Sequence, residues 1–244
     1  MDHTALGYVL ARPREVSGSL ANDRMPDRIL SVSECLATVG PGTWSLPWVR
    51  MDDADRAKEA VGLGLSAEQL PAIGAWVNAS MSRGDWGWPG YFRTLDAAHQ
   101  FIAEFEPRAG DLVLLGVGLP TDLVRKMLAD HPPPGPDSRV GRTAVETFVA
   151  DLVGLSDADS VLGYELLNDE IGGGFHSWMC GALEPDIHDA LGVLVNQYGL
   201  IDDGPTARAA AELIERDEMG EPGYWRPWLL AQYSFGRPAE AIDR

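Results

Sequence analysis

Three residues whose side chains can catalyse reactions lie within the stretch GGGFHSWMC, which covers residues 172–180. His176 can act as a base, and Ser177 or Cys180 can act as a nucleophile, provided that the side chains lie within hydrogen-bond reach. On an extended strand, however, His176 and Ser177 point to opposite faces, and about 13 Å separates His176 from Cys180. The stretch therefore favours a β-hairpin, with the glycines in the turn and residues 175–180 in the returning strand, over a catalytic loop.

Glu165 is an acidic residue within the apolar segment VLGYELL, residues 161–167. A buried carboxyl group needs a partner or has a raised pKa, and either is typical of a functional pocket. An enzymatic alternative follows, in which His176, Cys180 and Glu165 are the catalytic residues of a hydrolase or a transferase. Because neither a phosphate-binding GxxxxGKS/T loop nor a GxSxG motif occurs, we favour a protein that is not an enzyme.

A metal site can be written with His176, Cys180, Asp186 and His188 as ligands. The paired ligand spacings of structural zinc sites do not occur, and the HEXXH motif is absent. A glycine pair at residues 116–118 follows a predicted strand, as in nucleotide-binding turns, but the third glycine of GxGxxG is missing. We therefore expect no metal and no cofactor.

Tryptophan is the compositional outlier: the chain has eight, and six of them fall in three loop clusters that also contain proline or glycine. Large aromatic side chains in loops can anchor a protein partner or line a small-ligand pocket, and they can equally fold onto the core. The clusters are Trp44/Trp48, Trp86/Trp88 and Trp225/Trp228. As binding residues we expect Trp86, Trp88, Trp178, Trp225 and Trp228.

The charge balance narrows the choice of partner. The chain of 244 residues has 19 Lys and Arg against 37 Asp and Glu, a formal net charge of −18. Such a charge repels nucleic-acid phosphates and anionic membranes, and it attracts basic proteins. We therefore expect a protein partner, preferably a basic one, and neither nucleic acid nor membrane. The oligomeric state stays open.

The expected location follows from what the chain lacks. The N-terminal stretch has no basic and apolar pattern of a secretory signal, and no run of about 18 apolar residues occurs. Cys35 and Cys180 are 145 positions apart, and no disulfide framework is indicated. The sequence thus predicts a soluble cytoplasmic protein with free thiols.

Hydrophobic periodicity and capping residues predict a mixed α+β fold, with amphipathic helices packed on a sheet of about five strands. The expected strands are 5–11, 111–117, 161–167, 175–180 and 224–233. The expected helices are 31–39, 52–63, 66–81, 94–105, 121–130, 143–152, 186–194 and 206–215. We expect a single globular domain, 1–244. The alternative is an N-terminal lobe, 1–130, and a C-terminal lobe, 139–244, joined by a proline-rich linker, 131–138.

The phrases DLVLLGVGLP, LGYELL, GFHSWMC and EPGYWRPW resemble a family of uncharacterised bacterial cytosolic proteins. The resemblance covers about the last two thirds of the chain and implies no activity or catalytic residues. Size and acidity are also similar to those of the immunity proteins of bacterial toxin systems. The leading hypothesis is a non-enzymatic acidic protein that binds a protein partner, as in toxin neutralisation. The alternatives are the enzyme above and a small-ligand binder lined by tryptophans.

Overall fold

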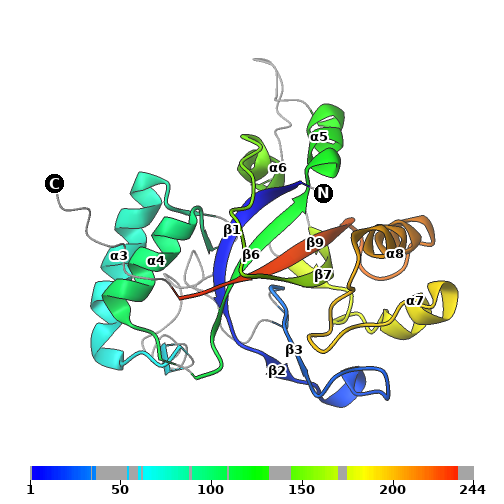
Figure 1. The fold of residues 1–244 in the computed structure, drawn as a ribbon, viewed down its shortest axis with the longest axis horizontal. Helices are drawn as coiled ribbons and strands as arrows, with labels where there is room; N and C mark the ends of the chain where they lie inside the picture. Colours follow the sequence, from blue (N-terminus) through cyan, green and yellow to red (C-terminus); the bar gives the residue numbers. More distant parts are fainter. Residues whose placement is uncertain are drawn as a thin grey trace.

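A computed structural model describes residues 2–33, 35–36, 54, 60–61, 63–87, 90–108, 110–131, 144–169 and 175–235 (Figure 1). The strands are β1 (His3–Ala11), β2 (Arg14–Glu15), β3 (Arg28–Ile29), β4 (Trp86–Gly87), β5 (Tyr91–Phe92), β6 (Val113–Pro120), β7 (Ser160–Asp169), β8 (Phe175–Ser177) and β9 (Tyr224–Tyr233). The α-helices are α3 (Leu70–Arg83), α4 (Leu95–Phe105), α5 (Thr121–Asp130), α6 (Ala144–Val149), α7 (Glu184–Leu191) and α8 (Gly204–Arg216). Two short 3-10 helices are η1 (Gly18–Leu20) and η3 (Ala67–Gln69).

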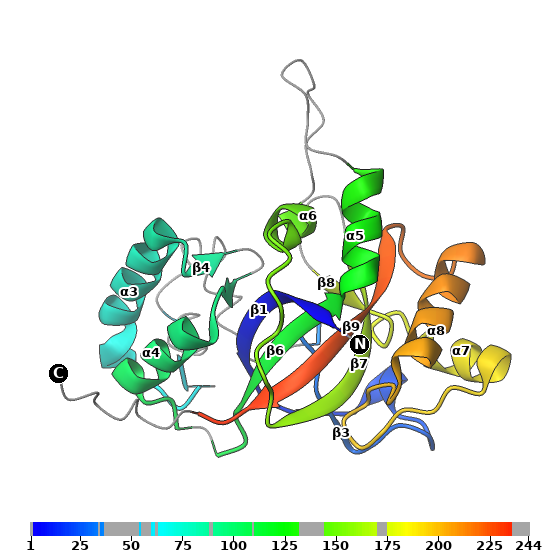
Figure 2. The same cartoon turned by 45° about the horizontal axis from the view of Figure 1, so that its top comes forward.

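The core of the fold is a seven-stranded antiparallel sheet in the order β4-β5-β1-β6-β9-β7-β8. Figure 2 shows how strongly this sheet curls. Strands β2 and β3 form a separate small sheet. The predicted α+β class is confirmed. Strands that precede the proline-rich segment, β1 and β6, and strands that follow it, β7 and β9, belong to one sheet; residues 132–138 themselves lie outside the described part.

Alternation along β9 assigns the helices to the two faces of the sheet. Trp228 and Leu230 pack in a cluster with side chains of α5 and α6. Leu229 faces the opposite way, into a cluster with α7 and α8. Ala231 and Tyr233 share the face of Leu229 and pack in a third cluster with α3 and α4. The sheet therefore supports three groups of helices, which Figures 1 and 2 show at three sides of it.

Local capping signals place most of the helices where they were predicted. The Thr94 side chain accepts a hydrogen bond from the backbone N–H of Ala97 and begins α4. Ser66 and Gln69 form a capping box before α3. Within the predicted helix 31–39, residues 31–33 are not helical, because the Ser31 side chain bonds Glu165 instead of capping a helix; residue 34 and residues 37–39 lie outside the described part, as do most residues of the predicted helix 52–63.

The predicted hairpin of β7 and β8 is present, although its turn, residues 170–174, is not described. Strand β8 ends at Ser177 instead of reaching Cys180. The chain turns there, with the N–H of Cys180 donating to the carbonyl of Ser177 and the N–H of Leu183 to that of Trp178. Side-chain alternation therefore holds for residues 175–177 and is lost after them.

None of the helices within the described ranges is long and apolar enough to span a membrane.

Candidate functional site

Glu165 lies on the face of β7 that packs towards α5 and α6, opposite Trp228 on β9, and its side chain is fully buried. The hydroxyl of Ser31 donates to Oε1 at 2.5 Å, and the N–H of Val32 donates to Oε2 at 3.0 Å. The Ser177 hydroxyl also lies near the carboxyl group and favours its charged form. Burial raises the pKa of Glu165 to about 7, against the lowering effect of these three groups.

A chain of polar side chains leads from Glu165 towards the surface. The hydroxyls of Ser31 and Ser33 lie 2.7 Å apart, and the thiol of Cys35 donates to Oγ of Ser33 at 3.5 Å. Cys35 is half-buried. A carboxyl group with a pKa near 7 suits general acid–base catalysis. The Glu165 carboxyl, however, has no exposed surface that a substrate could touch.

The two cysteines, distant in the sequence, are brought together. Cys180 lies in the turn after β8, and its thiol is close enough to that of Cys35 for the two to interact electrostatically. Burial, and after it the contact with Cys35, raises the pKa of Cys180 to about 12. A catalytic thiol needs the opposite shift, because the thiolate is the nucleophile.

His176 lies on the other face of the sheet from Glu165. In the β7–β8 pair, Ser177 is opposite Leu167 and shares the face of Glu165, whereas His176 is opposite Asn168. Its Nδ1 lies 3.2 Å from Oε2 of Glu221. His176 and Glu165 therefore do not share one site. The turn of residues 170–174, beside which the catalytic pocket was expected, lies outside the described part of the chain.

The tryptophans expected to bind a partner are core residues wherever the structure describes them. The indoles of Trp86, Trp178, Trp225 and Trp228 are all buried. Trp86 packs edge-on against Phe92, with 4.7 Å between ring centroids, and Trp228 packs on Phe175 at 5.1 Å. In this conformation these four side chains are not accessible to a protein partner. Trp44, Trp48 and Trp88 lie outside the described residues.

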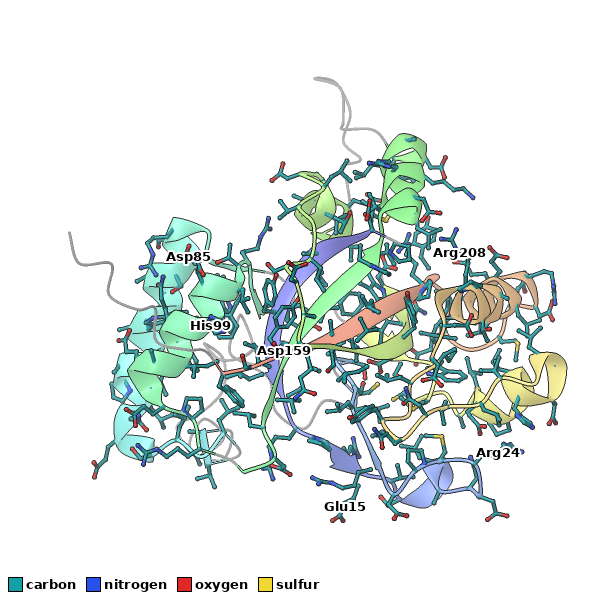
Figure 3. The ribbon with its side chains drawn as sticks, in the orientation of Figure 1. Glu15, Arg24, Asp85, His99, Asp159 and Arg208 are labelled. Atoms are coloured by element: carbon teal, nitrogen blue, oxygen red, sulfur yellow. The ribbon has the colours of Figure 1, made fainter. Side chains whose placement is uncertain are left out.

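A groove of about 270 Å³ lies between α5 and α8, with the start of β9 as its floor. Arg208 of α8, labelled in Figure 3, lies at the side of its helix nearest α5 and forms two hydrogen bonds with Asp122 of that helix. Each helix contributes one face, with residues spaced by three and four. The lining residues are Leu123, Lys126, Met127, Asp130, His131, Arg208, Ala211, Glu212, Glu215, Tyr224, Trp225, Arg226 and Pro227.

Two buried carboxyl groups support the floor of this groove. Oε1 of Glu146 lies 2.5 Å from Nδ1 of His131, and Asp169 forms an ion pair with Arg226. Burial raises the pKa of Asp169 to about 6; Arg226 opposes the shift and the charge of Glu146 adds to it. Sequence reasoning missed this cluster because its members come from four separate segments, with no motif that connects them.

A strongly acidic surface covers α7, α8 and the segments around them. Residues 184–221 contain ten Asp or Glu and two Arg, a net charge of −8 out of the −18 of the chain. Most of these carboxylates are exposed, whereas Glu184 is buried and forms an ion pair with Arg24. Arg24 is labelled in Figure 3. Leu191 and Leu194 are 45% and 64% exposed in the same region. We call this region, residues 184–221, the acidic surface.

Within the described ranges, no group of three or more His, Cys, Asp or Glu is arranged to hold a metal ion. No protein-family model, no curated protein and no solved structure matches the chain.

Proposed function

We propose that the protein binds a basic protein partner through the acidic surface. The observation that supports this proposal is the concentration of charge: residues 184–221 are 38 in number and carry −8 of the net −18. Helices α7 and α8 lie next to each other at one side of the molecule (Figures 1 and 2), so their carboxylates act together on an approaching partner.

Charge of one sign accelerates association and excludes partners of the same sign, whereas affinity also requires desolvated apolar contacts. Leu191 and Leu194 provide exposed apolar side chains within the same region, residues 184–221. The surface thus combines electrostatic attraction with apolar area. A basic toxin, as the similarity in size and charge to immunity proteins implies, is one partner of this class.

The experiment begins with capture of partners by the tagged protein from its host lysate at low and at high salt. It then measures the affinity of the purified pair with two variants of equal charge change. The first neutralises Asp186, Asp189 and Glu218 to Asn, Asn and Gln. The control neutralises Glu68, Glu104 and Asp151, which are exposed on other parts of the chain.

We expect one stoichiometric partner, released by salt, whose affinity falls about tenfold or more in the first variant and stays unchanged in the control. Equal losses in the two variants would mean that total charge, not the acidic surface, determines binding. A partner that is insensitive to salt, or the absence of any partner, contradicts the proposal.

A further inference from the structure

The groove between α5 and α8 has the construction of a small-molecule site. Its two walls are helix faces, and its floor is the sheet strand β9. A volume of about 270 Å³ lies just below the usual range of ligand pockets, which indicates a small metabolite instead of a nucleotide or a peptide. The apolar part of the lining comes from Leu123, Met127, Ala211, Trp225 and Pro227.

Arg226 is a fixed cation in the floor. Its side chain is 12% exposed, it donates to Asp169 through Nη1, and its guanidinium lies 4.9 Å from the centre of the Tyr224 ring. His131, held by Glu146, lies next to Tyr224, with 6.0 Å between the ring centroids. A guanidinium held in this way is suited to bind a carboxylate or a phosphate without first losing side-chain entropy.

The walls carry charges of both signs. Lys126 on α5 is exposed, and so are Asp130 on α5 and Glu212 on α8. Arg208 is paired with Asp122, and Glu215 accepts the backbone N–H of Trp225, so these two have structural partners.

A ligand with a single charge would be repelled by the groove residues that carry the same sign. Asp169 engages Nη1 of Arg226, and a guanidinium has further N–H donors. A ligand that carries both signs places its anionic group against these donors and Lys126, and its cationic group against Glu212 and Asp130.

We infer that this groove binds a small zwitterion, an amino acid or a molecule with the same pair of charged groups, with its apolar side chain against α5 and β9. The groove shares α8 with the acidic surface, but Asp186, Asp189 and Glu218, whose neutralisation tests the partner proposal, do not line it. The two proposals are therefore tested by different residues.

The experiment is isothermal titration calorimetry of the full chain with each of the standard L-amino acids. For any amino acid that binds, the same titration follows with the analogue that lacks the ammonium group and with the analogue that lacks the carboxylate. We expect at least one amino acid to bind with a Kd below about 10 mM, and each single-charge analogue to bind about tenfold more weakly or worse.

Matched variants locate the site. Lys126→Gln and Glu212→Gln each remove one exposed charge of the groove, and we expect each to weaken binding about tenfold without a change in Tm. The controls are Arg125→Gln, on the next position of α5, and Glu218→Gln, which does not line the groove; both should bind as the wild type does.

Three results would overturn the inference: no heat of binding from any amino acid up to about 10 mM, single-charge analogues that bind as tightly as the zwitterion, or groove variants that bind as well as their controls. Lys126→Gln should leave capture of the basic partner unchanged, so failure here is distinguishable from failure of the proposed function.

Discussion

The hydroxyl of Ser31 donates a hydrogen bond to the carboxyl group of Glu165, 134 positions away in the sequence, with 2.5 Å between Oγ and Oε1. The contact attaches the segment after β3 to the buried face of β7. It also places an ionisable group in the core, where its protonation is coupled to folding.

Glu165→Gln should remove a pH dependence of stability. The pKa of Glu165 is about 7 in the folded protein and 4.5 in an ordinary environment. Between these values the folded state binds more protons than the unfolded state, so stability falls as the pH rises through this window. We expect the wild type to lose up to about 3 kcal/mol relative to the variant between pH 4.5 and pH 8.

Urea unfolding of the two proteins across this pH range measures the difference, with Glu104→Gln as an exposed control. Parallel pH profiles for the wild type and Glu165→Gln would show that the carboxyl group titrates normally.

Arg226→Met should leave Asp169 as a buried charge without its cation. We expect a loss of about 3 to 5 kcal/mol at pH 8. The loss should be smaller at pH 5, because the pKa of Asp169 is already raised to about 6 and rises further without Arg226, so that the carboxyl group is then neutral.

Chemical denaturation at both pH values tests this, together with the double variant that adds Asp169→Asn. The double variant should recover most of the loss at pH 8. If it is no more stable than Arg226→Met, the cost comes from lost packing and not from the unpaired carboxylate.

Cys180 should react slowly with iodoacetamide at pH 7.5, although the residue is exposed. Its pKa of about 12 leaves far less thiolate than a free cysteine has. Cys35→Ala removes a neighbour that raises this pKa, so it should accelerate the reaction. Mass spectrometry over time follows the labelling, and the urea-unfolded chain provides the unprotected rate. Rapid labelling of the folded wild type would instead indicate a reactive thiolate and would revive the catalytic interpretation.

Gly7→Ala should destabilise the pairing of β1 with β5. A Cβ atom at this position would lie 2.6 Å from the carbonyl oxygen of Phe92, which is backbone and cannot move aside alone. We expect a loss of about 1 to 3 kcal/mol and a lower Tm. Gly110→Ala is the control, because an added Cβ there meets no atom within 4 Å. Thermal unfolding of both variants gives the comparison, and equal Tm values would contradict the predicted clash.

Local patterns in the sequence were sufficient to predict the α+β class and the strands β1, β6, β7, β8 and β9. They also predicted helix starts such as Thr94, where the cap bonds a backbone group three residues away. Alternation and capping act over a few residues, so their physical basis is present in the sequence itself. The net charge is likewise a property of composition, and binding of a basic partner stays a prediction that rests on it.

The tertiary structure alone decided which residues meet. The strand register places His176 and Glu165 on opposite faces of the sheet. The Ser31 hydroxyl, which was expected to cap a helix, donates to Glu165 instead. Packing against the sheet buries four of the tryptophans that were expected to bind a partner, Trp86, Trp178, Trp225 and Trp228. It also brings Cys35 close to Cys180. The floor of the groove depends on two side-chain pairs between distant segments, His131 with Glu146 and Arg226 with Asp169. Contacts between such distant segments depend on strand pairing and on the burial of opposing faces, and no local pattern encodes them.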